Sequence, residues 1–110
     1  MTSQVHPSSY ISDKVKLANN VKIGPYCYLN GNISIGENTE LKSHVVISGS
    51  CTIGNNVFVG VNATFHDGLT IGAESLIGAG ALITKNTKPK EAYINPSTKP
   101  FPKNSEQLGF

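Results

Sequence analysis

The fold is decided by residues 47–82, which divide into six consecutive hexads: ISGSCT, IGNNVF, VGVNAT, FHDGLT, IGAESL and IGAGAL. Each hexad opens on a large apolar residue, and stepping by six in both directions extends the series without a slip. All fourteen positions of the series are apolar: Val5, Ile11, Leu17, Ile23, Leu29, Ile35, Leu41, Ile47, Ile53, Val59, Phe65, Ile71, Ile77 and Ile83. Neither an α-helix, with period 3.6, nor a simple strand, with period two, produces this rhythm. A strict period of six predicts a repeat architecture with one hexad per structural unit.

The other hexad positions predict a short strand followed by a corner. A second, mostly smaller side chain follows four residues after each large apolar one, so two residues per hexad face inward. The third position includes Pro7 and Pro25, and Pro pre-sets the first central residue of a type II turn. The fourth position favours residues that tolerate the positive φ of the second central residue. Asn or Gly occupies it in eight hexads: Asn20, Asn32, Asn38, Asn56, Asn62, Gly68, Gly80 and Asn86.

The repeat pattern stops close to Lys88, and the following segment is rich in proline. Pro89, Pro96, Pro100 and Pro102 cannot donate to a ladder of strands. We therefore predict two segments, a β-helix over residues 1–88 and an irregular Pro-rich tail over residues 89–110. The tail is expected to cap the open edge of the last coil or to lie over a neighbouring subunit.

Composition excludes several classes of protein. The chain has 110 residues, enough for one domain, and a net charge of +2. All nine basic residues are Lys, and the absence of guanidinium groups argues against a nucleic-acid reader. No run is apolar enough for a signal peptide or a membrane span, so we predict a cytoplasmic protein without a membrane partner. Cys27 and Cys51 both occupy an inward position, which predicts buried, reduced thiols.

The pattern resembles the bacterial hexapeptide transferases across nearly the whole chain. Residues 6–12, HPSSYIS, and 41–46, LKSHVV, resemble UDP-N-acetylglucosamine acyltransferases. Residues 43–49, SHVVISG, 60–64, GVNAT, and 77–83, IGAGALI, are similar to the last coils of sugar O- and N-acetyltransferases. The resemblance implies an all-β fold, a single-stranded left-handed parallel β-helix of about five coils with three faces per coil. It also implies a homotrimer with acetyl-CoA in the groove between neighbouring subunits.

The chain departs from these relatives in two places. By hexad phase, the corners at which relatives carry a catalytic His correspond here to Gly31-Asn32 and Gly49-Ser50. Neither pair can take a proton from a sugar amine or hydroxyl near neutral pH. Many relatives also place a nucleotide-sugar-binding domain before the helix, whereas the repeat here begins almost at Met1.

Acetyl transfer requires a base near the nucleophile and hydrogen-bond donors for the developing oxyanion. His44 is the best candidate base, because imidazole titrates near neutrality. It occupies a corner, with Asn62 expected one coil above and Tyr26 one coil below. Asn62 would orient the imidazole or donate to the oxyanion. The alternative is that His44 only fills a positive-φ turn position, where His is enriched.

A second group of residues is expected to hold acetyl-CoA. Gly78, Ala79 and Gly80 allow a tight turn, and the resemblance implies that the pantetheine arm passes close to the backbone there. Lys85 and Lys88 would meet the phosphates of CoA as point charges, or would only solvate the exit from the helix. The three His residues are scattered without Cys or carboxylate partners at ligand spacing, so no metal site is predicted.

These observations lead to one main hypothesis and two alternatives. The main hypothesis is an acyl-CoA-dependent acetyltransferase acting on an amino or hydroxyl group of a sugar or nucleotide-sugar. The first alternative is a catalytically silent trimeric β-helix that serves as a scaffold or binding module. The second is a partial site completed by a separate sugar-binding protein. The sequence does not specify the acceptor, the acyl length, or whether nitrogen or oxygen is modified.

Overall fold

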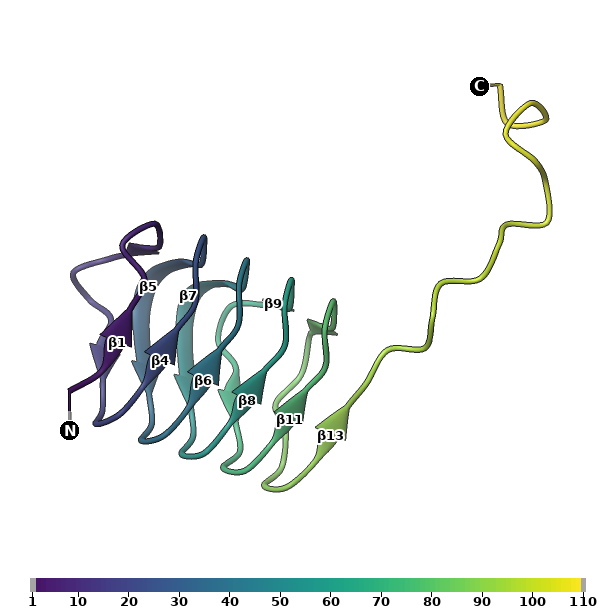
Figure 1. Cartoon of the computed structure of the whole chain (residues 1–110). Helices are drawn as coiled ribbons and strands as arrows, with labels where there is room; N and C mark the ends of the chain where they lie inside the picture. The colour runs from purple at the N-terminus through teal and green to yellow at the C-terminus, as the bar shows by residue number, and fades with distance from the viewer. Residues whose placement is uncertain (1, 110) are drawn as a thin grey trace.

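The computed structural model describes residues 2–109 and shows a left-handed parallel β-helix of about five coils (Figure 1). Met1 and Phe110, the outer limits of the two predicted segments, lie outside the described residues. No α-helix occurs among residues 2–109. The strands are β1 (Gln4–Val5), β2 (Tyr10–Ile11), β3 (Lys16–Leu17), β4 (Lys22–Ile23), β5 (Tyr28–Ile35), β6 (Glu40–Leu41), β7 (Val46–Ile53), β8 (Phe58–Val59), β9 (Thr64–Phe65), β10 (Thr70–Ile71), β11 (Leu76–Ile77), β12 (Leu82–Ile83) and β13 (Ala92–Tyr93).

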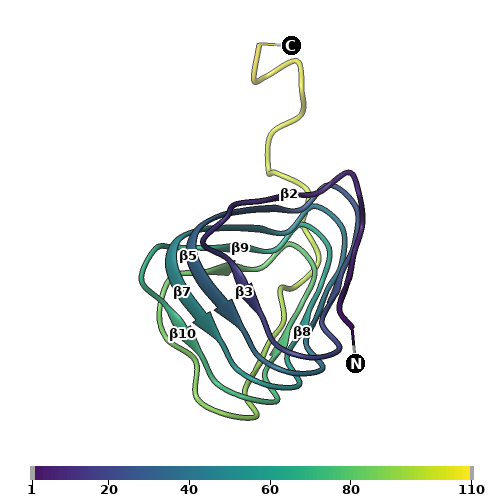
Figure 2. The same cartoon turned by 90° about the vertical axis from the view of Figure 1, so that its left-hand side faces the viewer.

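The coils have three faces, which give the solenoid a triangular outline when viewed along its axis (Figure 2). Face A is a six-stranded sheet in the order β1-β4-β6-β8-β11-β13. Face B contains β2, β9, β12 and the first halves of β5 and β7, while face C contains β3, β10 and the second halves of β5 and β7. Faces B and C form one sheet because β5 and β7 continue from one face to the other.

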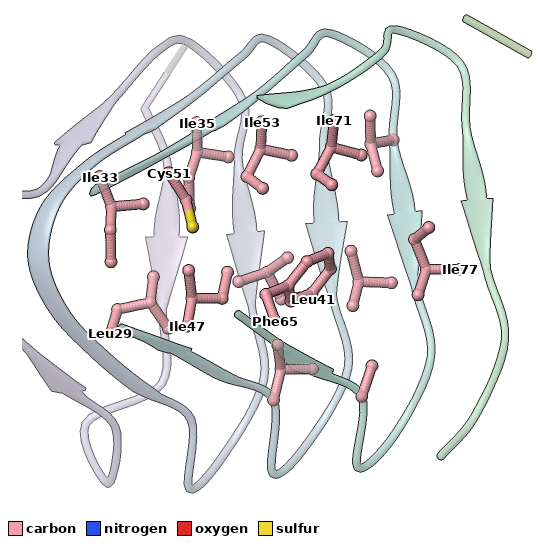
Figure 3. Close-up of a cluster of buried hydrophobic side chains, with 14 of the residues drawn as sticks. Leu29, Ile33, Ile35, Leu41, Ile47, Cys51, Ile53, Phe65, Ile71 and Ile77 are labelled. Atoms are coloured by element: carbon pink, nitrogen blue, oxygen red, sulfur yellow. The ribbon is translucent and has the colours of Figure 1, made fainter. Parts of the chain in front are cut away.

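Residues eighteen apart pair across the coils, as three hexads per coil require. Gln4 pairs with Lys22, and Lys22 pairs with Glu40. Each column of side chains along the solenoid therefore contains every eighteenth residue. The apolar positions therefore form three stacked rows inside the solenoid, and Ile35, Ile53 and Ile71 show one of these rows in Figure 3. From Val21 to Ile83 the inward apolar residues are buried in one cluster, and the predicted core is confirmed. Val5 at the N-terminal end is 39% exposed, because no described coil covers it.

We name the corners after the faces they join. The AB corner contains residues 25–26, 43–44, 61–62 and 79–80, and the CA corner contains residues 19–20, 37–38, 55–56 and 73–74. At these positions the fourth hexad residue has positive φ, as predicted, whereas Ser8, at the AB corner of the first coil, does not. It does so even where it is neither Asn nor Gly, at Tyr26, His44 and Glu74. The required turn geometry therefore dominates local residue preference at these positions.

The prediction is wrong at two positions of the BC corner, which contains residues 13–14, 31–32, 49–50, 67–68 and 85–86. Asn32 and Asn86 are not among the residues with positive φ. In the second coil the positive φ moves one position earlier, to Gly31 at 131°, and in the third to Gly49 at 81°. The paired strands β5 and β7 then run through the corner over eight residues each. The hexad phase alone does not reveal this change, because glycine suits either position.

The prediction that Pro89 ends the ladder is also wrong. Thr87 bridges to Ile71, and β13 pairs with β11, in both cases sixteen residues apart. The last coil is therefore two residues shorter than the others. This shift brings Pro89 and Lys90 into a CA corner above Ala73, whose carbonyl accepts the Lys90 N–H at 2.9 Å. Pro89 lies in a turn, where its missing N–H is not needed, so the boundary predicted at residue 88 falls inside the last coil.

Polar side chains at inward positions form hydrogen bonds with backbone carbonyls of the next coil. The hydroxyls of Ser9 and Thr39 donate to carbonyls fifteen residues further on, at 2.7 and 2.8 Å. The thiols of Cys27 and Cys51 make the equivalent contacts to the carbonyls of Lys42 and His66. Both thiols are buried and unpaired with each other, as predicted, and burial raises the pKa of Cys27. No buried side-chain N or O atom in residues 2–109 lacks a partner, which agrees with the rule for native interiors.

After β13 the chain leaves the solenoid and runs away from it (Figure 1). Asn95 is the last residue tied to the coils, through a bond from its side-chain amide to the carbonyl of Gly80 at 2.7 Å. Further on, Asn104 and Gln107 exchange side-chain to backbone hydrogen bonds and form one isolated turn. Phe101 is 64% exposed. The capping or inter-subunit role of the tail stays a prediction.

Candidate functional site

The AB corner presents the predicted catalytic residues in one column. Tyr26, His44 and Asn62 occupy the same position in consecutive coils, with φ values of 58°, 60° and 61°, and all three are exposed. Backbone bonds join the coils here: the His44 N–H donates to the Pro25 carbonyl, and the Asn62 N–H donates to the Ser43 carbonyl, both at 3.0 Å. The predicted order of Tyr26, His44 and Asn62 along the axis is therefore confirmed.

The ring of His44 packs on the ring of Tyr26. Their centroids are 5.3 Å apart and the planes are inclined by 38°. Within residues 2–109 the side chains of His44 and Asn62 form no hydrogen bond with each other. The imidazole is thus supported from one side by an aromatic ring, and His44 is exposed. This arrangement can accept a proton from a hydroxyl or amine that approaches the corner.

The backbone at Tyr26 and His44 is held in the left-handed region, which costs L-residues with a Cβ about 1–2 kcal/mol each. The equivalent residues at the CA corner include Asn20, Asn38 and Asn56, for which this conformation is easier. Glu74 and Lys90 at the CA corner share this conformation, so it follows from the turn geometry and does not by itself mark a functional site.

Residues Gly78, Ala79 and Gly80 form the AB corner of the last complete turn of this column. The Gly80 N–H donates to the Val61 carbonyl at 2.8 Å, so this segment lies one coil above Asn62. A Cβ at Gly78 would lie 3.0 Å from the carbonyl oxygen of Tyr93, and one at Gly60 would meet the backbone of Ala79. The small residues therefore have a packing role between coils, and they lie on the same corner as His44.

The structure does not bring the two predicted lysines together with this segment. Lys85 lies at the BC corner, and Lys88 lies close to the CA corner, where its backbone N–H donates to Glu91 Oε1 at 2.8 Å. The Lys85 and Lys88 ammonium groups are therefore carried by two different corners of the last coil, neither of which is the AB corner.

The BC corner carries no general base in the second and third coils. Its glycines allow the coils to approach closely: a Cβ at Gly31 would overlap the carbonyl of Gly49, and a Cβ at Gly49 would overlap the side chain of Asp67. Asp67 Oδ1 accepts the N–H of Ser50 at 2.7 Å, which directs the carboxylate towards the coil below. No hydrogen bond joins Asp67 to His66 in residues 2–109, so the two do not form a dyad.

Sequence reasoning missed a groove on face A beside the AB corner. Its volume is about 780 Å³. His6, Gly24 and Lys42 line it from the same hexad position of consecutive coils, and Lys22 lines it from β4. The 18-residue spacing of His6, Gly24 and Lys42 was the available signal, since it places a residue without a side chain between two long polar ones.

Among residues 2–109, no three His, Cys, Asp or Glu side chains are grouped so as to hold a metal ion. The same residues contain no helix with the length and apolar character needed to cross a membrane.

The hexad rhythm and the three-sided coil define a hexapeptide-repeat β-helix. The family described as Bacterial transferase hexapeptide (six repeats) matches residues 14–49 and 50–85. These two matches cover more than half of the chain, so the chain belongs to this family. A search of curated proteins finds no match.

Solved structures with the same fold include three acetyltransferases. GDP-perosamine N-acetyl transferase from Caulobacter crescentus, in complex with CoA and GDP-perosamine, has a TM-score of 0.64 and 24% identity over 86% of this chain and 54% of that chain. Serine acetyltransferase isoform 3 from Entamoeba histolytica, in complex with cysteine, has a TM-score of 0.59 and 23% identity, covering 84% and 39%. The acetyltransferase domain of PglB from Neisseria gonorrhoeae, in complex with acetyl coenzyme A, has a TM-score of 0.51 and 16% identity, covering 90% and 57%. At these identities the likeness shows the fold, and the chain spans 39% to 57% of the three proteins.

Proposed function

We propose that this protein is an acyl-CoA-dependent acetyltransferase that acts on an amino or hydroxyl group of a sugar or nucleotide-sugar. The observation that carries the proposal is the AB corner, where His44 and Asn62 stand exposed in consecutive coils of a transferase-family β-helix. Two of the three solved structures named above are described as complexes with CoA or acetyl-CoA, which supports the choice of donor.

In this proposal His44 removes a proton from the acceptor as it attacks the acetyl thioester, and the side-chain amide of Asn62 donates to the oxyanion. The acceptor attacks directly, and when the tetrahedral intermediate collapses the C–S bond breaks and the sulfur of coenzyme A takes the proton from the His44 imidazolium to leave as the thiol. Tyr26 limits the movement of the imidazole by packing on one face of it. No metal and no covalent enzyme intermediate take part.

Gly78, Ala79 and Gly80 would hold the pantetheine arm of acetyl-CoA close to the corner. Support comes from their position in the same corner column as His44. Lys85 and Lys88 remain candidates for the phosphates, although each lies at another corner, so they would contact CoA in an adjacent subunit's groove or at the end of a long ligand.

A homotrimer is part of the proposal, because the acetyl-CoA groove would lie between subunits. The large exposed apolar side chains of the solenoid lie on faces A and B or at the AB corner between them. They are Val5, Tyr10, Tyr26, Tyr28, Phe58, Val61, Leu76, Leu82 and Tyr93. The outward positions of face C are instead Lys16, Ser34, Thr52 and Thr70. Two adjacent apolar faces suit a cyclic assembly in which face A of one copy meets face B of the next.

Calorimetric titration of the purified chain with acetyl-CoA and with free CoA tests the proposal first. We expect one site per subunit, and a chain that stays monomeric in dilute solution would contradict a site between subunits. With amino and hydroxy sugars as acceptors, His44→Ala should lower turnover by about 10²- to 10⁴-fold while the trimer persists. His66→Ala, which changes an exposed His at the BC corner, should retain turnover.

A silent scaffold is the second candidate, and the BC corner is the observation that favours it. Gly31 and Gly49 remove the base from the corner at which relatives are expected to carry one, and Asp67 is engaged with Ser50. A correctly assembled trimer that binds neither acetyl-CoA nor CoA would favour this reading. Co-purification of a free-standing sugar-binding protein, with turnover only in the complex, would favour a partial site.

A further inference from the structure

The groove on face A ends at the proposed catalytic corner. It is lined there by Pro25 and Ser43, which directly precede Tyr26 and His44 in the chain. Its volume of about 780 Å³ lies within the range of small-molecule sites, roughly 300–1,000 Å³. Gly24 lies between His6 and Lys42 in the same column and lines the groove, and its backbone approaches the next coil closely, since a Cβ there would lie 3.1 Å from the carbonyl carbon of Lys42. A molecule in the groove would therefore reach the AB corner from face A.

His6 is held in one tautomer at the edge of this groove. The backbone N–H of Ser8 donates to His6 Nδ1 at 3.2 Å, and a backbone N–H can only donate. Nδ1 is then an acceptor without a proton, so the Ser8 hydroxyl, 2.8 Å away, also donates to it. The Ser8 oxygen in turn accepts the Tyr26 N–H at 3.0 Å, which connects this network to the next coil. In the neutral ring Nε2 therefore carries the proton, and within residues 2–109 it has no hydrogen-bond partner.

The charge of the groove is positive and arises from one lysine. Glu40 Oε2 forms an ion pair with Lys42 Nζ at 2.7 Å, and the same ammonium lies 5.7 Å from the centroid of the Phe58 ring. Lys22 lies beside Glu40 on face A, but within residues 2–109 it has no ion-pair partner. The two lysines and one carboxylate leave one positive charge, because Lys42 is neutralised by its partner.

We propose that this groove is the acceptor site and that the acceptor carries an anionic group, a phosphate or a carboxylate, held by Lys22 and His6. The ammonium of Lys22 supplies the charge, and Nε2–H of His6 supplies a directed hydrogen bond. The sugar ring then lies over Gly24 and extends to His44. This inference rests on the proposed function, and it adds an acidic class of acceptor and two residues that bind it.

Binding of three related sugars to the full chain tests the proposal: glucose 1-phosphate, glucuronate and glucose, by calorimetry at low salt. At least one of the two anionic sugars should bind ten-fold or more tightly than glucose. Preference for glucose 1-phosphate identifies a phosphate site, and preference for glucuronate identifies a carboxylate site. Equal affinity for all three sugars, or no binding of any of them, would overturn the proposal.

Single substitutions test whether the anionic sugar binds in the groove. Lys22→Ala and His6→Ala should each weaken binding of the preferred anionic sugar about ten-fold, and His6→Gln should restore part of it because its side-chain amide keeps an N–H donor. Lys16→Ala, on the outward side of face C, and His66→Ala should bind like the unaltered chain. If Lys22→Ala and Lys16→Ala bind equally well, the groove does not hold the anion. Circular dichroism establishes that each variant is folded.

Titrations of the same proteins with acetyl-CoA and CoA test the proposed function independently of the acceptor groove. Lys22→Ala should bind acetyl-CoA as the unaltered chain does, since the proposed donor site uses other corners. Displacement of the anionic sugar by free CoA would assign the groove to the donor and would contradict an acceptor site there. Failure of the unaltered chain to bind acetyl-CoA would count against the proposed function, while the sugar titration would still report on the groove.

Discussion

The AB corner and the BC corner contain the same hexad positions, yet their turns have different backbone conformations. At the AB corner the chain keeps its six-residue rhythm and places Tyr26 and His44 in the left-handed region with their rings exposed. In the second and third coils of the BC corner, glycines carry the positive φ one position earlier, and the strands continue through it. One corner therefore displays side chains, and the other brings backbones into contact. This difference indicates why a candidate site is found at the AB corner.

The largest expected effect tests backbone contact at the BC corner. Gly49→Ala adds a Cβ that overlaps the side chain of Asp67 and requires positive φ, so it should lower the free energy of unfolding by about 3 kcal/mol. Gly68→Ala is the matched control, because Gly68 also has positive φ at this corner but has no atom within 4 Å of the added Cβ. It should cost about 1 kcal/mol. Urea denaturation of both variants measures the difference, and equal losses would show that only backbone strain matters.

A smaller effect is expected at the carboxylate that closes the BC corner. Asp67→Ala removes the acceptor of the Ser50 N–H and should cost about 1.5–3 kcal/mol, the range for a hydrogen bond to a charged group, with the low end expected at this exposed position. Asp13→Ala alters an exposed carboxylate at the same corner of the first coil and should change stability by less than about 0.5 kcal/mol. Thermal denaturation compares them. A loss as large in Asp13→Ala would mean that general surface charge is responsible.

At the AB corner, relieving strain should stabilise the protein. Tyr26→Asn and His44→Asn replace ring side chains with a residue that accepts φ near +60°, so each should raise the free energy of unfolding by about 0.5–1 kcal/mol. For a chain of this size, that corresponds to roughly 2–8 °C in melting temperature. His44→Asn should at the same time lower turnover by about 10²- to 10⁴-fold, because it removes the proposed base. Destabilisation by His44→Asn would mean that packing against Tyr26 contributes more than the strain removes.

The smallest effect concerns the CA corner of the last coil. The pKa of Glu91 is lowered from its ordinary value of 4.5, first by the Lys88 N–H and then by the Tyr93 hydroxyl. A lowered folded-state pKa stabilises the protein above the ordinary pKa, and this contribution is lost as pH falls through the folded-state value. Glu91→Gln should therefore lose less stability than the unaltered chain on acidification below about pH 4.5. Melting curves across this range, with Glu106→Gln in the tail as control, should show a small difference confined to Glu91.

Much of the fold could be predicted because its apolar and turn residues recur at a fixed interval of six residues. The positions of Val21 to Ile83 in the core, the pairing at eighteen residues and most corners follow from side-chain size and turn chemistry within single hexads. The sequence did not show that Asn32 and Asn86 lack positive φ. Gly31 can take the positive φ in place of Asn32, and the last coil, which contains Asn86, is two residues shorter than the others. Pro89 was misassigned for a related reason, since proline is excluded from a strand but favoured in a turn.

Some features of the candidate site likewise follow from the sequence, and others only from the tertiary structure. The sequence by itself determined the repeat, the inward rows, and the column that places His44 between Tyr26 and Asn62, because period and residue type are local properties. Only the tertiary structure decided that Lys85 and Lys88 lie at other corners than Gly80, and that the carboxylate of Asp67 is turned towards Ser50. It alone showed the open groove beside Gly24, with Glu40 paired to Lys42 and Lys22 left without a partner among the described residues. These features depend on contacts between residues brought together by coiling, and their energies are set by the neighbouring coil.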